Sequence, residues 1–372
     1  MKILILSKRI YTNKDLVADR YGRVYEFSRE LARHGHRVHG IALDYRRGVH
    51  DEWMDGEEAN PRWFAYSLSP GPVRGLRRYL SEVRKLVQVW QPDALVSVSD
   101  VYHVILGDWL ARKYAVSHVV DLYDNYESFG AARLPGVIGR YRKALRRAQG
   151  ISCVSASLKN YLLGQVGTHR EPRVIHNAVD KDNFHPMDRD ACRRRLGLPE
   201  TGRIVGLGGS ISEYRGVNAV FQAHRSLIEA GQEVHLALAG AVAGDAEIPE
   251  SPFIHYLGQL DYAEMPYFYN ALDVGIVTNK DNPFSRYCFP QKFFELCACA
   301  RPVVVASVGD VREFIAPCEQ GLFTPGDGQQ LAVALKRQLD SPCLASVSVP
   351  DWTEQGARLV TLLETLKPTR AG

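Results

Sequence analysis

The sequence predicts an α/β protein with two doubly wound parallel sheets. Short apolar runs rich in valine, isoleucine and leucine recur along the chain, and segments with helical periodicity separate them. Strands that alternate with helices of about 10–15 residues are typical of parallel sheets, in which each connection crosses over through a helix. Because 372 residues exceed the length of one ordinary hydrophobic core, we expect two such domains.

The first half of the chain shows this alternation from its first residues. Helical patterns at 21–34 and 101–114 lie between apolar runs. Gly35 and His36 follow the first pattern and are typical of a helix end that leads into a strand. The strands expected here are residues 2–7, 37–43, 94–97, 118–122 and 151–155.

The second half repeats the alternation after a turn-rich segment at 171–184, which is the expected linker. A last helix is expected at 353–366, directly after Trp352. We expect a Rossmann-like domain at 1–173, a second at 174–350 and a C-terminal helix within 351–372. The strands expected in this half are residues 203–207, 234–239, 253–257, 274–277 and 302–306.

Composition is that of a soluble globular protein, with 45% hydrophobic and 24% charged residues. No apolar run reaches the roughly 18 residues of a membrane span, and the first ten residues read as a strand. The seven cysteines are scattered, and Cys297 and Cys299 lack zinc spacing, so a reduced, cytoplasmic protein is expected. A net charge of +4 is too small to indicate a nucleic-acid partner.

The segment at 282–315 is the most informative part of the chain. It reads as a loop, a helix that begins near Pro290, and a valine-rich strand at 303–305. A helix N-terminus at the carboxyl ends of parallel strands is a suitable site for a diphosphate. Glu295 lies one turn inside this helix, where its carboxylate could accept hydrogen bonds from ribose hydroxyls.

A second glycine-containing turn lies at 208–216, between an expected strand and an expected helix. Its glycines would let the backbone approach a phosphate, and Arg215 would neutralise the charge. The alternative is an ordinary strand-to-helix turn with a solvated arginine. Ile211 occupies the third glycine position of a dinucleotide motif, and no glycine follows Ser7, which argues against NAD. We expect no cofactor.

The segment at 282–315 resembles the nucleotide-sugar signature of the group 1 (family four-like) retaining glycosyltransferases of the GT-B fold. Their pattern is Glu, seven residues, Glu, then a small-residue turn and Pro-Val-Val. Glu295 matches the second Glu, whereas Tyr287 stands at the first. The run Pro290-Gln291-Lys292 is similar to members that carry Pro-x-Lys. The linker at 175–180 is similar as well, and the helix after Trp352 resembles one that crosses back onto the first domain.

The resemblance implies transfer of a sugar from a nucleoside-diphosphate sugar to a hydroxyl of a glycan or lipid-linked acceptor, with retention of configuration. Arg215 stands where the family has a lysine that binds the donor diphosphate. Arg215 and Glu295 are also counted among the catalytic candidates. The expected donor-binding residues are Gly22, Gly209, Ser210, Arg215, Pro290, Gln291, Lys292 and Glu295.

The same resemblance places the acceptor against the first domain. Gly22 opens the first long helix, where the family has a glycine loop, and Asp124 stands where many relatives have a histidine. Asp124 could deprotonate an acceptor hydroxyl, which makes it a catalytic candidate, although a helix N-cap is an ordinary role for aspartate. The expected acceptor-side residues are Gly22, Asp100, His103, Asp121 and Asp124.

No metal site is expected. Asp188 and Asp190 form a DxD string, but it lies just past the linker before a basic helix, where a solvated helix start fits better. A helix dipole and a basic side chain can stabilise a leaving diphosphate without a metal.

Residues 134–149 form a basic amphipathic helix that suits anionic lipid headgroups. This helix could hold the protein on the inner face of a membrane, or it could be a solvated helix on a sheet. Val137, Ile138, Tyr141 and Leu145 fall on one side, and Arg140, Arg142, Lys143, Arg146 and Arg147 fall on the other.

Two alternatives to a transferase stay open at this point. A nucleotide-sugar epimerase of the same architecture would show acid–base carboxylates and histidine around the sugar and no acceptor surface. A non-catalytic nucleotide- or carbohydrate-binding protein would be consistent with Tyr287 at the usual position of the first Glu.

Overall fold

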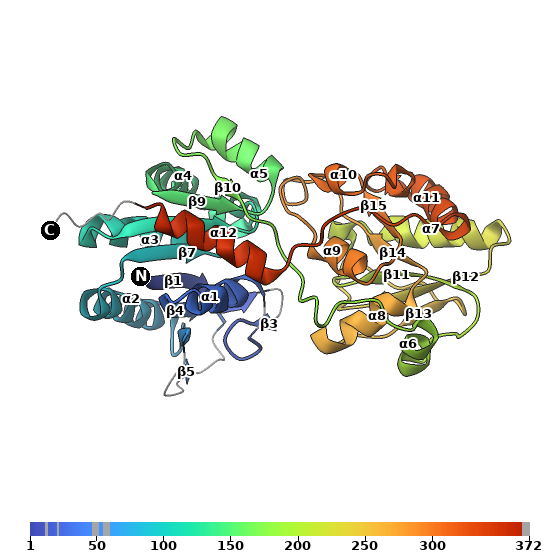
Figure 1. Cartoon of the computed structure of the whole chain (residues 1–372), viewed down its shortest axis with the longest axis horizontal. Helices are drawn as coiled ribbons and strands as arrows, with labels where there is room; N and C mark the ends of the chain where they lie inside the picture. Colours follow the sequence, from blue (N-terminus) through green and yellow to red (C-terminus); the bar gives the residue numbers. More distant parts are fainter. Residues whose placement is uncertain (12–13, 21, 47–51, 55–59, 367–372) are drawn as a thin grey trace. The chain divides into compact units, whose positions relative to one another are not determined.

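The computed structural model describes residues 1–11, 14–20, 22–46, 52–54 and 60–366, and the chain separates into two compact units. Unit 1 consists of Met1–Asn177 together with Trp352–Gly372, and unit 2 is Ala178–Asp351. Each unit is an α/β sandwich with helices on both faces of its sheet (Figure 1). The expected architecture of two doubly wound parallel sheets is therefore confirmed.

Unit 1 is built on an eight-stranded sheet in the order β10-β9-β8-β7-β1-β4-β6-β5. Every strand pairs in parallel except β5, which lies antiparallel at the edge. The central strands β1, β7 and β8 are buried along nearly their whole length because helices cover both faces of the sheet. The strands are β1 (Lys2–Lys8), β4 (Arg37–Asp44), β5 (Glu52–Met54), β6 (Arg62–Ser67), β7 (Ala94–Val98), β8 (Ser117–Leu122), β9 (Gly150–Cys153) and β10 (Arg173–Val174).

The core of unit 1 lies between this sheet and its helices. One cluster joins Leu4 and Leu6 of β1 to Tyr79 and Val83 of α2 and to Leu110 of α3. A separate hairpin of β2 (Ile10–Tyr11) and β3 (Lys14–Asp15) follows β1. The helices are α1 (Arg23–Arg33), α2 (Pro72–Trp90), α3 (Val101–Tyr114), α4 (Val137–Arg147), α5 (Ala156–Tyr161) and α12 (Trp352–Glu364), with short helices η1 (Tyr126–Ser128), η2 (Gly130–Arg133) and η3 (Leu162–Val166).

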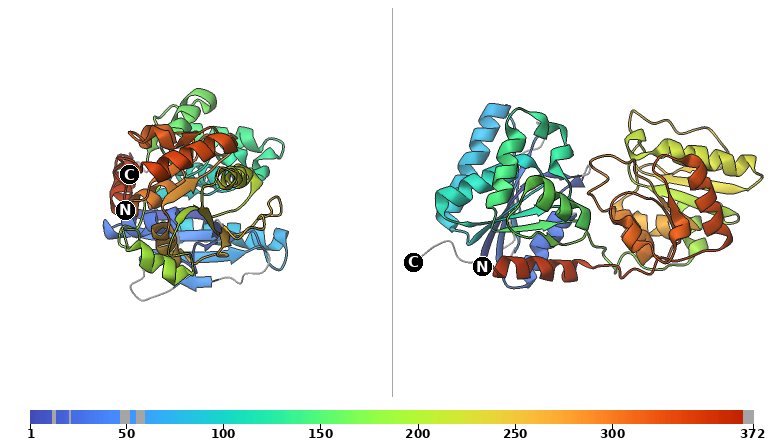
Figure 2. Two further views of the ribbon diagram at one scale, coloured as in Figure 1. Left: turned by 90° about the vertical axis from the view of Figure 1, so that its right-hand side faces the viewer. Right: turned by 90° about the horizontal axis from the view of Figure 1, so that it is seen from above.

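The last helix, α12, packs on α1 at the start of the chain, as Figures 1 and 2 both show. Trp352 lies edge-on to Phe27 of α1, with ring centroids 5.7 Å apart. Gly356 lets the two helices approach closely, since a Cβ there would lie 2.4 Å from that of Glu30. The expected return of the C-terminal helix to the first domain is confirmed.

Unit 2 contains a fully parallel six-stranded sheet in the order β13-β12-β11-β14-β15-β16. The strands are β11 (Arg203–Gly208), β12 (Val234–Ala239), β13 (Ile254–Tyr256), β14 (Val274–Val277), β15 (Val303–Ala306) and β16 (Leu322–Phe323). The helices are α6 (Arg189–Leu196), α7 (Val217–Glu229), α8 (Met265–Ala271), α9 (Gln291–Ala298), α10 (Val311–Phe314) and α11 (Gly328–Asp340), with short helices η4 (Glu213–Arg215), η5 (Tyr262–Glu264) and η6 (Glu319–Gly321).

Helices α7 and α11 pack side by side over one face of this sheet and share a core with β11, β12, β14 and β15. The other face is approached by α8 and α9. Gly206 and Gly275 leave room there, since a Cβ on either would lie 2.4 Å from Leu272 or Leu296 respectively. This close packing fixes the start of α9 at the carboxyl ends of the strands.

The cysteines depart in one respect from the reduced state expected from their spacing. Cys318 and Cys343 form a disulfide with 5.6 Å between their Cα atoms. Their separation of 25 residues carries no signal in the sequence, but the fold brings the end of α10 beside the segment after α11. Gln338 holds the same segment by accepting from the Cys343 amide at 2.8 Å. Within the described part of the chain, no helix is long and apolar enough to cross a membrane.

Candidate functional site

In unit 2, the turn after β11 is open at the backbone because two glycines meet there. Gly209 has φ of 97°, a conformation that side chains disfavour, and its amide donates to the Ala239 carbonyl at 2.7 Å. A Cβ on Gly240, after β12, would lie 1.9 Å from the Gly209 carbonyl oxygen. The two strand ends therefore pack backbone against backbone, and the next residue, Ser210, is exposed.

Lys292, in the first turn of α9, extends to this glycine turn. A Cβ on Gly209 would fall 2.1 Å from the Lys292 Nζ, so the ammonium group occupies the space that a side chain would take. Burial, together with the nearby Arg215, lowers the pKa of Lys292 to about 8, while Glu295 opposes the shift. A bound anion would relieve this repulsion between two cations.

Arg215 lies at the end of η4, directly before Gly216, which has φ of 85°. Ser212 caps this short helix by accepting from the Arg215 amide at 3.3 Å. The guanidinium donates to Asn279 Oδ1 at 3.2 Å and lies 4.4 Å from the ring centre of Phe284. Asn279 and Phe284 follow β14, so the carboxyl ends of two neighbouring strands hold this cation.

Glu295 is buried one turn deeper in α9. Tyr269 donates to one carboxylate oxygen and Gln291 to the other, both at 3.1 Å. Burial raises the pKa of Glu295 to about 7, against the effect of these hydrogen bonds and of Lys292. Pro290 occupies the N-cap position and Gln291 is the first helical residue. The carboxylate is thus fixed in place and close to its ionisation point at neutral pH.

An aromatic cluster holds the start of α9 in position. Phe289 stacks on Phe294 with ring centroids 4.5 Å apart, and Phe314 of α10 lies edge-on to Phe289 at 4.7 Å. Because large buried rings strongly restrict motion, this cluster makes the first turn of α9 a rigid platform.

Unit 2 therefore brings together a glycine turn, two cations and a helix start, with a carboxylate one turn away. Of the residues expected from the sequence, Gly209, Arg215, Lys292, Gln291 and Glu295 are joined by these contacts. Sequence reasoning missed Asn279 and Tyr269. Asn279 had a signal, because it lies two residues beyond β14 at a strand carboxyl end, whereas Tyr269 sits within α8 and had none.

In unit 1, Gly22 is the N-cap of α1 and has φ of 87°. It is buried, and its carbonyl accepts the Glu26 amide at 3.0 Å. Only glycine suits this conformation without strain, so the chain enters α1 through a tight backbone loop.

Asp124 follows β8 and is half-buried. Its neighbour Asn125 performs the capping role considered for it, by accepting from the Glu127 amide at 3.2 Å. Lys8, at the end of β1, is near enough to Asp124 and Asp100 that both raise its pKa, although burial is the larger effect and lowers it overall.

The strand ends of β1, β7 and β8 are tied together by Ser99, which sequence reasoning missed. Its hydroxyl accepts from the Lys8 amide at 2.7 Å, and its own amide donates to the Tyr126 hydroxyl at 2.8 Å. Ser99 has φ of 87°, which is unfavourable for a residue with a side chain.

The other three acceptor-side candidates have structural partners. Asp121 is buried and bonds to Arg23 and to the Ser152 hydroxyl, the latter at 2.7 Å. Asp100 is the N-cap of α3 and also accepts from His103 Nδ1 at 2.8 Å. Burial raises the pKa of Asp100, but its contacts with His103 outweigh this effect and lower it. His103 is only 2% exposed, so its ring belongs to the core.

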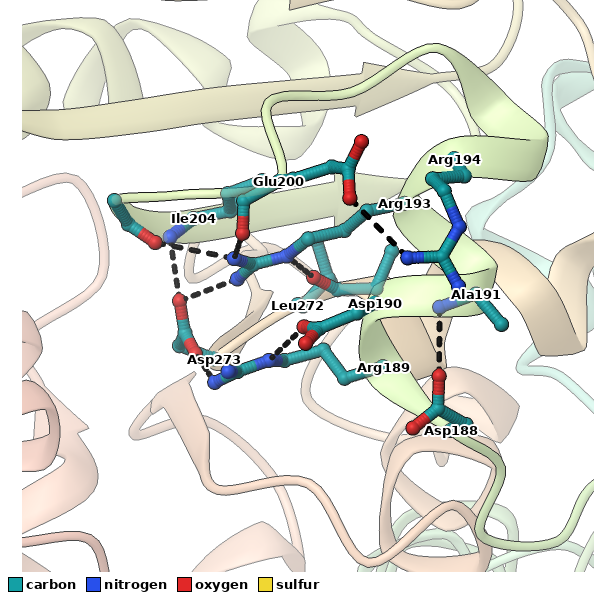
Figure 3. A network of polar contacts seen from close by, with 12 residues as sticks. Asp188, Arg189, Asp190, Ala191, Arg193, Arg194, Glu200, Ile204, Leu272 and Asp273 are labelled. Carbon is teal, nitrogen blue, oxygen red and sulfur yellow. Dashed lines mark hydrogen bonds and ion pairs between the residues drawn. The ribbon is translucent and has the colours of Figure 1, made fainter.

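The DxD string at 188–190 is part of a structural network (Figure 3). Asp188 caps α6 by accepting from the Ala191 amide at 2.7 Å, and Asp190 pairs with Arg189 at 3.2 Å. Arg193 is buried beside them and donates to Asp273 at 2.8 Å. No group of three or more candidate metal ligands occurs among the described residues.

The basic helix expected at 134–149 is α4, and neighbouring elements engage part of its charge. Arg142 binds Glu127 in a bidentate pair, at 2.9 and 2.7 Å, and Arg147 lies 3.4 Å from Asp108. Arg140 and Lys143 are exposed. The acids come from other elements, so the sequence of the helix alone gave no sign of them.

The two units match two family models. Residues 23–183 match Glycosyltransferase Family 4, and residues 202–341 match Glycosyl transferases group 1. A GDP-mannose-dependent alpha-mannosyltransferase of Mycolicibacterium smegmatis is 24% identical over 341 residues, covering 90% of this chain and 87% of the relative.

Solved structures agree on the fold. Sucrose-phosphate synthase from Thermosynechococcus elongatus superposes with a TM-score of 0.75 at 18% identity, over 97% of this chain and 94% of that one. Anabaena HepE in complex with UDP-glucose superposes with a TM-score of 0.73 at 18% identity, over 98% and 100% respectively. These matches favour a transferase over the epimerase and the non-catalytic alternatives. The chain is a glycosyltransferase of the GT-B fold, with a Family 4 match in its first half and a group 1 match in its second.

Proposed function

We propose that unit 2 binds a nucleoside-diphosphate sugar, with the diphosphate at Gly209, Arg215 and Lys292 and the ribose at Glu295. The observation that carries this proposal is the convergence of two cations on a glycine turn at a helix start. Each of these features favours an anion, and together they stabilise the charge of a leaving diphosphate without a metal. The complex of HepE with UDP-glucose supports this class of donor.

We propose that the sugar passes to a hydroxyl of a glycan or lipid-linked acceptor held by unit 1 near Gly22 and Asp124. Asp124 is a half-buried carboxylate at a strand carboxyl end of this unit, and it lies near Lys8. A carboxylate there can accept the proton of an acceptor hydroxyl. Retention of configuration is the outcome that the family resemblance implies.

A peripheral position on the inner face of a membrane is proposed for the same enzyme. Leu134, which is 58% exposed, follows the exposed Arg133 in the chain, and Arg140 and Lys143 of the next helix, α4, are also exposed. An exposed leucine among cations suits an anionic bilayer surface. Vesicles with anionic lipid should bind the protein at low salt and release it at high salt, and an Arg140→Ala/Lys143→Ala variant should bind more weakly. Absence of binding at low salt would contradict this position.

The donor site is tested by calorimetry with UDP, GDP and ADP. The wild type should bind at least one of them. Arg215→Ala should weaken that binding by about 1.5–3 kcal/mol, the range for hydrogen bonds to charged groups. Arg195→Ala is a matched control, because Arg195 also stacks on an aromatic ring in unit 2, 4.1 Å from the ring centre of Tyr267, but lies on the exposed surface. Equal affinities in all three proteins would refute the site.

A further inference from the structure

The chain passes between the two units twice, and the two connections are hydrogen-bonded to each other on both sides of the boundary. The crossings lie at Asn177–Ala178 and Asp351–Trp352. In unit 1, the His176 amide donates to Gln355 Oε1 of α12 at 3.0 Å. In unit 2, the Val179 amide donates to the Pro350 carbonyl at 3.1 Å. At each crossing, only a few residues separate these two hydrogen bonds.

One buried side chain, Arg23, contacts the first connection directly and is linked to the second through Phe27. Its Nη1 donates to the His176 carbonyl at 2.9 Å and reaches Asn177 Oδ1 at 3.4 Å, which holds the first connection directly. Its guanidinium lies 4.4 Å from the ring centre of Phe27, and Phe27 lies edge-on to Trp352, the first residue after the second crossing.

The positive charge of Arg23 is paired with the carboxylate of Asp121. Nε and Nη2 donate to the two oxygens of Asp121 at 2.9 and 2.8 Å, and the Ser152 hydroxyl adds a third bond to that carboxylate. Both side chains of the ion pair are at most 3% exposed. A planar guanidinium can bind both oxygens of a carboxylate and donate to a carbonyl from its third nitrogen, a fixed geometry that the compact ammonium group of lysine does not reproduce.

We infer that Arg23 is a positioning residue that anchors both inter-unit connections on unit 1. The Asp121 pair fixes the guanidinium on β8, and the third nitrogen fixes the first connection against it. The same residue is the first of α1, so the Gly22 loop is held by the same anchor. The consequence for catalysis rests on the proposed function, in which donor and acceptor bind to different units and the connections must hold them in register.

The first test uses Arg23→Lys, which keeps the charge and loses the fork. Hydrogen exchange should speed up at the amides of His176 and Val179 and stay unchanged in β4, which is remote from the connections. The matched control is Arg142→Lys, since Arg142 is also a bidentate arginine of unit 1 but contacts neither connection. Unchanged exchange at His176 in Arg23→Lys would overturn the inference.

The second test separates positioning from binding. Affinity for the nucleoside diphosphate that binds the wild type should stay within about twofold in Arg23→Lys, because the donor residues lie in unit 2. The kcat for consumption of UDP-glucose or GDP-mannose should fall at least about tenfold, as misplacement of reacting groups predicts. An unchanged kcat would contradict the inference. If the wild type binds no nucleotide, the proposed function fails, while the exchange result still decides the role of Arg23.

If Arg23→Lys does not fold, Gln355→Leu tests the hydrogen bond that joins the two connections which Arg23 is inferred to anchor. It removes the acceptor of the His176 amide and leaves the Arg23–Asp121 pair intact. Exchange should then rise at His176 alone, and kcat should fall while nucleotide affinity is retained. Unaltered exchange at His176 in this variant would also refute the paired arrangement of the connections.

Discussion

The ammonium group of Lys292 occupies the space beside Gly209 where a side chain would begin. The two residues are far apart in sequence, one in a turn after β11 and the other in the first turn of α9. Their contact places a cation with a lowered pKa beside a backbone that is open to a ligand. The proposed diphosphate site depends on this contact more than on any other pair.

Gly209→Ala should therefore displace the Lys292 ammonium and weaken nucleoside-diphosphate binding at least about tenfold, the loss of one charged hydrogen bond. Because the clashing atom is the end of a flexible chain, the protein should fold, with a loss of about 1–2 kcal/mol from the positive φ. Calorimetry and urea unfolding measure the two effects.

Gly231→Ala is the control for this change. Gly231 also has a positive φ, 75°, but nothing lies within 4 Å of a Cβ there. It should show the same loss of stability with unchanged nucleotide affinity. Unchanged nucleotide affinity in Gly209→Ala would mean that Lys292 does not contact the diphosphate.

Donor affinity should depend on pH with a maximum between about 7 and about 8. A ribose needs the ionised form of Glu295, whose pKa is about 7, so affinity should rise with pH through that value. A diphosphate needs the protonated form of Lys292, whose pKa is about 8, so affinity should fall above it. Calorimetry across this range measures the profile. Glu295→Gln should abolish the rise of affinity with pH near 7 and leave the fall above about 8. A wild-type affinity that does not change with pH would contradict the roles given to both Glu295 and Lys292.

Stability should fall as the pH drops from about 6.5 toward 4 because His118 is buried as a neutral ring. Burial lowers its pKa to about 4, so the unfolded chain takes up a proton in this window and the folded protein does not. The contribution of neutral His118 to the free energy of unfolding is therefore complete above about pH 6.5, and about 3 kcal/mol of it is lost by pH 4.

Urea unfolding at several pH values measures this dependence. His118→Gln should reduce the slope of the free energy of unfolding against pH by the equivalent of about one proton, since the titrating ring is gone. His169→Gln is the control, because His169 is exposed, and it should leave the slope unchanged. An equal slope in the wild type and in His118→Gln would show that other groups cause the acid sensitivity.

The sequence predicted the strands and several helices well, because their signals are local. Val101–Tyr114 was expected as a helix and is α3, and the valine run at 303–305 is the centre of β15. Strand β6 was missed, because it follows a polar segment and lacks regular alternation. Such patterns describe burial along one element and say nothing about which elements meet.

The candidate site was predictable only in part for the same reason. Glycines and charged residues at strand ends pointed to Gly209, Arg215 and Glu295. The burial that shifts the pKa of Glu295, and the acids that neutralise Arg142 and Arg147, come from residues distant in sequence. Asp121 was expected on the acceptor side, and the structure adds an ion pair with Arg23 that no local pattern indicates.

The Cys318–Cys343 disulfide should raise stability under oxidising conditions. It closes a loop of 25 residues, which corresponds to about 3.5 kcal/mol in the chain-entropy model. Cys343→Ser should lose this amount in urea unfolding without reductant. With reductant present, the wild type and the variant should have nearly equal stability. A wild type whose stability is insensitive to reductant, with two free thiols at these positions, would contradict the bond.

The DxD string should act as a helix cap rather than as a metal ligand, and two substitutions of Asp188 distinguish these roles. Asn retains an oxygen that can accept the Ala191 amide, so Asp188→Asn should be nearly as stable as the wild type. Asp188→Ala loses the cap and should cost about 1 kcal/mol in urea unfolding.

Transferase activity in the folded protein should be the same in both variants and insensitive to EDTA, because Asp188 and Asp190 bond within α6 and the proposed site for the diphosphate uses Arg215 and Lys292. A metal ligand would give the opposite pattern. Both variants would then lose activity together, since an amide binds a divalent cation far less well than a carboxylate, and EDTA would abolish turnover until Mg²⁺ or Mn²⁺ was restored.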